Sequence, residues 1–433
     1  MRRFFLYCLK KTLRLFARSE IKRHKPRIIG VTGSVGKTST KAAIYTVFDK
    51  ATDKNVRMAG GNLNNELGFP LAILGDYKRS GGAGFWAGVL IRELLRYLLV
   101  RNDCDYPDIL ILEYGADKPG DIKKLTKIAK PDVAVITAVG DVPVHVEYYD
   151  SPEAVAKEKA SLLNGLGAKG TAVLNVDDPY VFDMRETART EVVTFGFDSL
   201  ADVRIRYFEN RSEDSKPYGL FLRLNADDMD VSVTIEGVFG RSQAYAACAA
   251  AAVGLMEDGV TLTKIAEALA FYEGMKGRTR LIEGIKDSWI LDDSYNASPV
   301  SSQAALEILD ELEAKRKVAV LGDMLELGVY TEEAHKDTGR YAAQVADYII
   351  TVGARARFIA EAARSLDFPK KRVESFDTSD DAKRRVQEII KEGDLVLVKG
   401  SQGMRMEKIV QEIMAEPERA GELLVRQYGK WIN

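Results

Sequence analysis

The stretch GVTGSVGKTSTK, residues 30–41, decides the fold of the first half of the chain. An apolar, β-branched run, PRIIGVTG, leads into it, and KTSTKAAIYTVF, which has the pattern of an amphipathic helix, follows. The order is therefore strand, tight glycine loop and helix. The usual spelling of a phosphate-binding loop, G-x-x-x-x-G-K-[ST], would place glycine at position 31, where this chain has Val31. Since G-K-T-S-T follows a buried strand, we predict a variant phosphate-binding loop and not an ordinary glycine-rich turn.

The side chains of this loop suit a nucleotide. Gly33 and Gly36 let backbone amides face a phosphate, and the start of the helix adds partial positive charge. Lys37 would reach the outer phosphates, and the hydroxyl of Thr38 could bind Mg²⁺. The predicted nucleotide-binding residues of the stretch are Gly33, Ser34, Gly36, Lys37, Thr38 and Ser39.

Length and composition favour two or more domains in a reducing compartment. The chain has 433 residues, of which 46% are hydrophobic, so it can bury more than one core. Its three cysteines are scattered, which argues against a disulfide framework or a paired-cysteine metal site and indicates the cytoplasm. The formal net charge is only −2, and no nucleic-acid partner is expected.

Residues 1–25 form a cationic leader. The first 27 residues contain ten Lys or Arg and one acid, Glu20. A helix would bring the apolar residues Phe5, Leu9, Leu13 and Phe16 near one face, which suits attachment to an anionic membrane surface. Packing on the protein's own surface would give the same pattern. The longest uncharged run, Phe4 to Leu9, is too short to span a bilayer.

A second apolar stretch, GFWAGVLIRELLRYLLV (residues 84–100), leaves three interpretations open. It could be a core helix, a dimer face or another membrane-contacting patch.

The remaining pattern predicts an α/β protein with two domains. The β-type runs DILILEYGA, DVAVITAVG and GTAVLNVDD alternate with helix-like segments, which implies a mostly parallel sheet. Residues 194–236 alternate as in an antiparallel edge, and a second, Rossmann-like α/β series begins at Arg278. We place the boundary near Gly277, with an ATPase domain over 26–277 and a C-terminal domain over 278–433.

Six stretches in one order closely resemble the Mur ligase family, especially its MurF type. They are GVTGSVGKTSTK, GNLNNELGFPLAIL, ILEYGADKPGDI, DDSYNASPVSSQAAL, AVLGDMLELG and VLVKGSQGMRME. The family's loop is T-G-S-x-G-K-T, so Val31 is normal for it. The resemblance implies ATP-dependent amide formation through an acyl phosphate, with ATP and Mg²⁺ as cofactors.

The resemblance also implies roles for residues of the first domain. Lys37 would hold the β- and γ-phosphates, and Thr38 the first Mg²⁺. Glu113 matches a metal-binding carboxylate at a strand end. His145 matches a histidine on a second Mg²⁺, although GDVPVH has two residues more than the family's usual GPAH. Lys159 falls where the family's lysine is carbamylated and becomes a metal-bridging anion.

Further roles concern the rest of the nucleotide and the substrate. Arg278 matches an arginine directed at the phosphates, and GRSQAYAA, which departs from the family's GRHNVxNA, leaves Gln243 to offer an amide to adenine. Ribose contacts are expected from Asp293, with Tyr295 and Asn296 beside it, and substrate contacts from Asn62, Asn64 and Asn65.

The implied substrates are a UDP-muramyl peptide, or a related carboxylate, and a dipeptide or amino-acid amine such as D-alanyl-D-alanine. The type carries an N-terminal uridine-binding domain, which we expect to be absent because only the leader precedes the loop. Two alternatives remain. One is a related ligase that acts on another carboxylate, as folylpolyglutamate synthetases do, and a lipid-linked carboxylate is one candidate. The other is a nucleotide-binding scaffold without catalysis.

Overall fold

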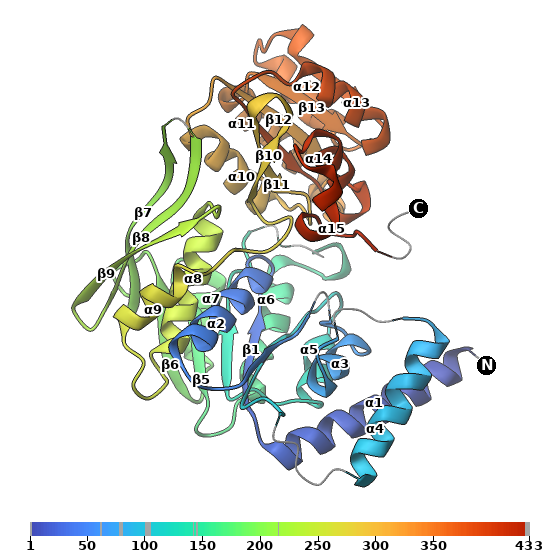
Figure 1. Ribbon diagram of the computed structural model, residues 1–433, viewed down its shortest axis with the longest axis vertical. Helices are drawn as coiled ribbons and strands as arrows, with labels where there is room; N and C mark the ends of the chain where they lie inside the picture. Colours follow the sequence, from blue (N-terminus) through green and yellow to red (C-terminus); the bar gives the residue numbers. More distant parts are fainter. Residues whose placement is uncertain are drawn as a thin grey trace.

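The computed structural model of the chain describes residues 2–60, 63–77, 81–99, 105–141, 143, 146–214 and 216–428. The described elements form two sheets, one of nine strands and one of six, which occupy opposite ends of the molecule (Figure 1). The nine-stranded sheet lies within residues 27–236, and the six-stranded sheet begins at Arg280. This is the predicted mixed α/β architecture.

The nine-stranded sheet has the order β2-β3-β1-β4-β5-β6-β7-β8-β9. The strands from β2 to β7 pair in parallel, whereas β7, β8 and β9 form an antiparallel extension, which confirms the predicted antiparallel edge. Its strands are β1 (Arg27–Thr32), β2 (Val56–Met58), β3 (Ile109–Glu113), β4 (Val133–Ile136), β5 (Thr171–Asn175), β6 (Glu191–Gly196), β7 (Val203–Glu213), β8 (Lys216–Ala226) and β9 (Met229–Glu236).

Two layers of helices cover this sheet. In β1, Ile29 and Val31 face the layer of α2, α8 and α9, and Ile28 faces the opposite layer, which includes α1, α3 and α5 (Figure 1). The alanines of α8 allow it to pack closely on α2. The helices are α1 (Arg2–His24), α2 (Lys37–Ala51), α3 (Gly68–Leu74), α4 (Ala83–Leu99), α5 (Asp121–Thr126), α6 (Pro152–Ala160), α7 (Pro179–Phe182), α8 (Arg241–Gly254) and α9 (Leu262–Leu269).

The leader forms α1 and packs on the protein itself. Leu9, Leu13 and Ala17 are buried in the core beside α3, and Phe16 is partly buried against it. Phe5 is exposed, so the four apolar residues do not form one continuous buried face. The interpretation as a packed helix is therefore confirmed for the middle of α1, while its first turns remain on the surface.

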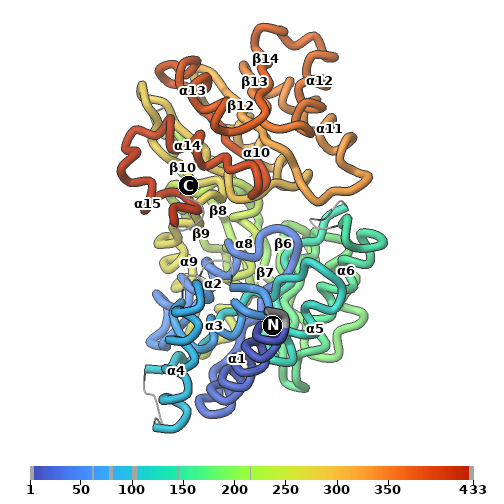
Figure 2. Tube along the Cα trace, turned by 90° about the vertical axis from the view of Figure 1, so that its right-hand side faces the viewer, coloured from blue at the N-terminus to red at the C-terminus, as the bar shows by residue number. Residues whose placement is uncertain are grey.

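The helix α4 covers most of the second apolar stretch and lies beside α1 (Figure 2). Only Trp86, Val89 and Glu93 of α4 are buried, which excludes the core-helix interpretation. Among the described residues, no helix combines the length and the hydropathy that crossing a bilayer requires.

The six-stranded sheet has the order β10-β11-β15-β12-β13-β14, in which only β10 is antiparallel to its neighbour. Because β11 and β15 are parallel neighbours, Asp293 lies opposite Lys399 at their carboxyl ends. The elements are β10 (Arg280–Gly284), β11 (Ser288–Asp293), β12 (Arg316–Gly322), β13 (Tyr348–Val352), β14 (Val373–Phe376), β15 (Asp394–Lys399), α10 (Pro299–Glu311), α11 (Thr331–Val345), α12 (Arg357–Ser365), α13 (Ser379–Ile389), α14 (Glu407–Ile413) and α15 (Ala420–Leu423).

Candidate active site

The predicted phosphate loop connects the end of β1 to the start of α2. Gly33 has φ 145° and Gly36 has φ 86°, both values that favour glycine. A Cβ atom on Gly33 would lie 2.1 Å from the hydroxyl oxygen of Thr137, which follows β4. That hydroxyl donates to the carbonyl of Val35 at 2.6 Å, so the loop is fixed from the neighbouring strand.

Two side chains of the loop lack the partners that an anion would supply. The hydroxyl of Ser34 is buried and has no hydrogen-bond partner. The ammonium of Lys37 folds back on the loop and donates to the carbonyls of Gly33 at 2.7 Å and Ser34 at 3.1 Å. Desolvation lowers the pKa of Lys37, although Glu113 acts in the opposite direction. A phosphate would satisfy both groups, so the loop fits the predicted role.

Glu113, at the end of β3, contacts three neighbouring polar side chains. Its carboxylate accepts from the Thr38 hydroxyl and from the side-chain amide of Asn64, both at 3.1 Å. The ammonium of Lys41 lies 3.5 Å away and is almost completely buried. Burial alone would raise the pKa of Glu113, but the cations Lys41 and Lys37 outweigh it, and the pKa falls below its ordinary value. Glu113 is thus an anion placed beside the Thr38 hydroxyl.

Lys159, on α6, is buried at the same end of the sheet. Its ammonium donates to the carbonyl of Ala116 at 3.3 Å. Burial, with the charge of Lys37 as the next cause, lowers the pKa of Lys159 to about 7. A large fraction of this side chain is therefore a neutral amine near neutral pH, and a neutral amine is nucleophilic.

These residues share one cavity of about 620 Å³. It receives side chains from both sheets' strand ends, as expected for ligand sites of α/β folds. Of the residues predicted from the sequence, it is lined by Gly33, Ser34, Lys37, Thr38, Asn64, Asn65, Glu113, Lys159, Arg278, Tyr295 and Asn296. His145 and Asn62 lie outside the described residues, and their roles stay predictions.

An adjoining cavity of about 340 Å³ contains the other predicted residues. Gly36, Ser39, Gln243 and Asp293 line it, together with Arg278, which lines both cavities. Apolar side chains such as Phe239 and Ile308 contribute much of the remaining wall. This combination suits a base and a sugar next to a phosphate loop.

The position of Gln243 differs from the expectation that its amide serves adenine. The side-chain amide nitrogen donates to the carbonyl of Arg278 at 3.1 Å, and the amide oxygen accepts from the Tyr272 hydroxyl at 2.9 Å. Both ends are thus used inside the protein. Gln243 holds the backbone at Arg278, whose guanidinium lies 4.2 Å from the ring centre of Tyr295.

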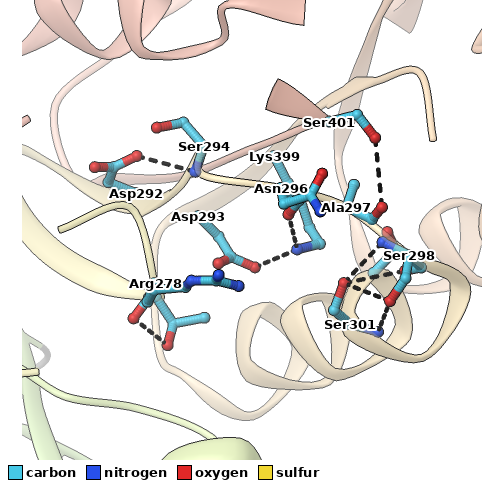
Figure 3. Close-up of polar contacts among 12 residues, drawn as sticks. Arg278, Asp292, Asp293, Ser294, Asn296, Ala297, Ser298, Ser301, Lys399 and Ser401 are labelled. Carbon is cyan, nitrogen blue, oxygen red and sulfur yellow. Dashed lines mark hydrogen bonds and ion pairs between the residues drawn. The ribbon is translucent and has the colours of Figure 1, made fainter. Parts of the chain in front are cut away.

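Asp293 is paired with a lysine to which the sequence pattern assigned no role. The ammonium of Lys399 donates to the Asp293 carboxylate at 2.5 Å and to the carbonyl of Asn296 at 3.0 Å (Figure 3). Both charged side chains are buried. Lys399 closes the stretch VLVK at the end of β15, and the strand-end position was the signal that could have identified it. The sequence pattern did not identify Lys41, because a lysine within a helix is expected to be either packed or solvated.

The donor set of the larger cavity fits Mg²⁺ better than a metal held entirely by protein. Within the described ranges, no group of three or more His, Cys, Asp and Glu side chains could hold a metal ion. Mg²⁺ commonly uses one or two protein oxygens together with substrate phosphates and waters. The Thr38 hydroxyl and Glu113 carboxylate, 3.1 Å apart beside the loop, provide such oxygens.

Comparison of the sequence with known families gives two matches. Residues 94–254 match the family described as Mur ligase middle domain, and residues 277–402 match the family described as Mur ligase, glutamate ligase domain. The UDP-N-acetylmuramoyl-tripeptide--D-alanyl-D-alanine ligase of Bacillus subtilis is 31% identical over 407 residues, which cover 94% of this chain and 79% of the relative. The ligase of the same name from Escherichia coli is 28% identical, covering 89% of this chain and 76% of the relative.

Solved structures of MurF ligases are also similar to this chain. The MurF ligase of Thermotoga maritima, in complex with ADP, superposes with a TM-score of 0.76 at 27% identity and covers 95% of this chain and 84% of that one. A MurF crystal structure from Acinetobacter baumannii gives 0.75 at 25% identity, covering 93% and 79%. The Escherichia coli FolC structure with ADP, at 17% identity and a TM-score of 0.61, shares the fold and covers 92% of each chain.

Proposed function

The chain belongs to the Mur ligase family, and from this premise we propose that it is an ATP-dependent ligase of the MurF type. It joins D-alanyl-D-alanine to a UDP-muramyl tripeptide in peptidoglycan precursor synthesis. The observation that carries the proposal is the convergence of Lys37, Thr38, Glu113 and Lys159 on one cavity beside the phosphate loop. A scaffold without catalysis would have no need of this buried cluster of opposite charges.

The reaction requires a carboxylate to approach a triphosphate, so negative charge must be neutralised. A carboxylate oxygen of the tripeptide forms a bond to the γ-phosphorus, and the bond from that phosphorus to the bridging oxygen of ADP breaks. The amine nitrogen of the dipeptide then bonds to the acyl carbon, inorganic phosphate leaves, and the nitrogen loses a proton. Bound Mg²⁺ would stabilise the charge on the phosphate oxygens.

We propose that the residues of the larger cavity have separate roles in this reaction. We infer that Lys37 leaves the carbonyls of its own loop and holds the β- and γ-phosphates, and that Arg278 acts from the opposite side. Thr38 and Glu113 would hold Mg²⁺, and His145 is proposed for a second ion. Asn64 and Asn65 line the same cavity and are proposed to contact the peptide.

The smaller cavity would take the nucleoside of ATP. Its apolar wall suits the base, and Asp293 is proposed to accept from the ribose hydroxyls while Lys399 keeps the carboxylate in place. The Lys399 ammonium also donates to the carbonyl of Asn296. A movement of Lys399 would therefore displace both the Asp293 carboxylate and the backbone at Asn296.

Lys159 is proposed to act as its carbamate. The neutral amine adds to the carbon of CO₂, a C–N bond forms, and the nitrogen loses a proton, which converts a buried cation into an anion. That anion would lie beside Lys37, whose charge already influences Lys159. The change therefore replaces repulsion between two cations with attraction.

The function is tested by phosphate release from ATP with purified full-length chain, a panel of UDP-muramyl peptides and a panel of amines. We expect release to require both a UDP-muramyl tripeptide and D-alanyl-D-alanine, with a product whose mass corresponds to the two joined by loss of water. Turnover with folate and glutamate in their place would identify the alternative ligase. Binding of ATP without release under any combination would support the scaffold.

We also propose that α1 and α4 attach the enzyme to the cytoplasmic face of an anionic membrane. On α4, Ile91, Leu94, Leu95 and Leu98 form one helical stripe and are 48–66% exposed. At the start of α1, Phe4 and Phe5 are exposed as well, and the only acid of that helix, Glu20, is buried. Apolar side chains flanked by cations, without exposed acids, are typical of helices at an anionic membrane surface.

The membrane proposal predicts that Phe4→Ser together with Leu95→Ser weakens co-sedimentation with phosphatidylglycerol vesicles by about tenfold, because the loss of inserted apolar area lowers the partition constant. Val329→Ser is the matched control, since Val329 is 92% exposed elsewhere on the chain. Equal co-sedimentation of the variant, the control and the wild type would reject membrane attachment.

A further inference from the structure

A groove with five cations runs along α1. It lies between α1 and the segment after α5, has a volume of about 410 Å³, and is lined by Arg14, Arg18, Lys22, Lys127 and Lys130. Its other lining residues, Ile21, Thr126 and Ile128, carry no charge. The groove is thus positive throughout.

These cations are not neutralised within the described part of the chain. Arg18, Lys22, Lys127 and Lys130 form no ion pair with another described residue, and Arg14 has only a 3.5 Å contact with the carbonyl of Lys127. Like charges gathered along one groove repel one another. An anion bound between them would reverse the sign of that interaction.

A small cavity lies between α1 and the candidate active site. The cavity, of about 280 Å³, shares Asn64, Asn65 and Asp117 with the larger catalytic cavity. At its other side it contains Lys10 of α1 and Leu125 of α5. Lys10 is one helical turn before Arg14, and Leu125 directly precedes Thr126, so the cavity and the groove are neighbours along α1, although they share no lining residue.

We propose that the groove binds the diphosphate of the acceptor substrate, while the carboxylate of the same molecule lies in the larger cavity near Lys37. The inference rests on the proposed function, because the acceptor of the curated relatives is by name a UDP-linked tripeptide, with a diphosphate far from the reacting carboxylate. A diphosphate suits the groove, since several cations can surround its oxygens at once.

In this arrangement the acceptor would extend along α1 from the larger cavity. A tripeptide spans about 10 Å when extended, and the stretch of α1 from Lys10 to Lys22 is about 18 Å long at the helical rise. The tripeptide would occupy the small cavity, and the sugar and diphosphate would follow α1 toward Arg14 and Arg18. The ion pair between Lys10 and Glu66, at 2.5 Å, lies at the side of this path.

The test compares Lys127→Ala/Lys130→Ala with Lys11→Ala/Lys169→Ala. All four lysines are exposed, and the control pair removes the same charge outside the groove. For the groove variant we expect the KM for UDP-muramyl tripeptide to rise about tenfold, because two charge-assisted contacts are lost, with kcat within about twofold of wild type. The dependence of KM on salt should also become shallower than in the control.

Direct binding separates the possible outcomes. UDP should bind the wild type and the control in calorimetry and should bind the groove variant about tenfold more weakly. An unchanged KM and an unchanged UDP affinity in the groove variant would overturn the proposal. Loss of binding to phosphatidylglycerol vesicles with unchanged UDP affinity would also overturn it and assign the groove to lipid headgroups. Absence of turnover in the wild type would instead contradict the proposed function.

Discussion

Replacing Lys37 by Ala is expected to reduce ATP turnover about a hundredfold or more. Lys37 is the cation at the start of α2, and among the described residues its ammonium donates only to two carbonyls of its own loop, those of Gly33 and Ser34. On phosphate transfer the charge on the outer oxygens of ATP increases, and a prepositioned cation stabilises that state. Loss of one such contact typically costs about 3 kcal/mol in the transition state, which corresponds to about two orders of magnitude in rate.

The measurement is phosphate release at saturating ATP and substrates, with Lys50→Ala as the matched control. Lys50 lies in the last turn of the same helix, and its side chain is about half exposed, so its removal leaves the loop unchanged. Circular dichroism and thermal unfolding would establish that both variants fold. Turnover of a folded Lys37→Ala protein at the wild-type rate would refute the assignment of the phosphate site.

The sequence predicted the order of strand, glycine loop and helix because this is a local structure. A β-branched strand, two glycines in positive-φ conformations and a helix start all lie within residues 27–51. The strand-end acid Glu113 could be placed for a similar reason, since parallel strands β1 and β3 bring their carboxyl ends to one edge. Local pattern and topology together therefore explain why the loop and Glu113 lie at the same edge of the sheet.

The contacts of the second half depend on pairings that no local pattern contains. Asp293 and Lys399 are separated by 106 positions and meet only because β11 and β15 are neighbours. The sequence therefore suggested a ribose contact for Asp293 but not its buried partner. Gln243 differs from the expectation for a related reason, because its oxygen is taken by Tyr272, which follows α9. The domain boundary near Gly277 stays a prediction.

The helical leader illustrates a different limit. The helical spacing of its apolar residues showed which of them share a face. The spacing did not show whether a membrane or the protein itself covers that face. The structure buries Leu9 and Leu13 beside α3 and leaves Phe4 and Phe5 exposed. Burial depends on the surface opposite the helix, which the helix sequence does not describe.

Replacing Lys159 by Ala is expected to leave less than about one hundredth of the wild-type ligase activity, because a buried anion next to the phosphates is lost. Lys157→Ala is the matched control, since Lys157 lies on the same helix, α6, and is exposed. If the carbamate is the active form, small carboxylates such as acetate or formate should restore part of the activity of Lys159→Ala. They should have no effect on the control.

The pH dependence gives an independent measurement of the same group. Burial lowers the pKa of Lys159 to about 7, so the amine is mostly protonated and unreactive toward CO₂ below that pH and mostly neutral above it. Carbamate formation should therefore increase as the pH is raised through about 7, in contrast to an ordinary lysine, for which the same increase would require a pH near 10.

The carbamate carbon can be followed by ¹³C NMR after addition of labelled bicarbonate to the full-length protein. The signal should be present in the wild type and in Lys157→Ala and absent in Lys159→Ala, and its intensity should rise over the same pH range as the activity. Burial also lowers the pKa of Lys37 and Lys41, so a signal that persists in Lys159→Ala would place the modification on another lysine. An active wild type without any carbamate signal would show that Lys159 acts as an unmodified amine.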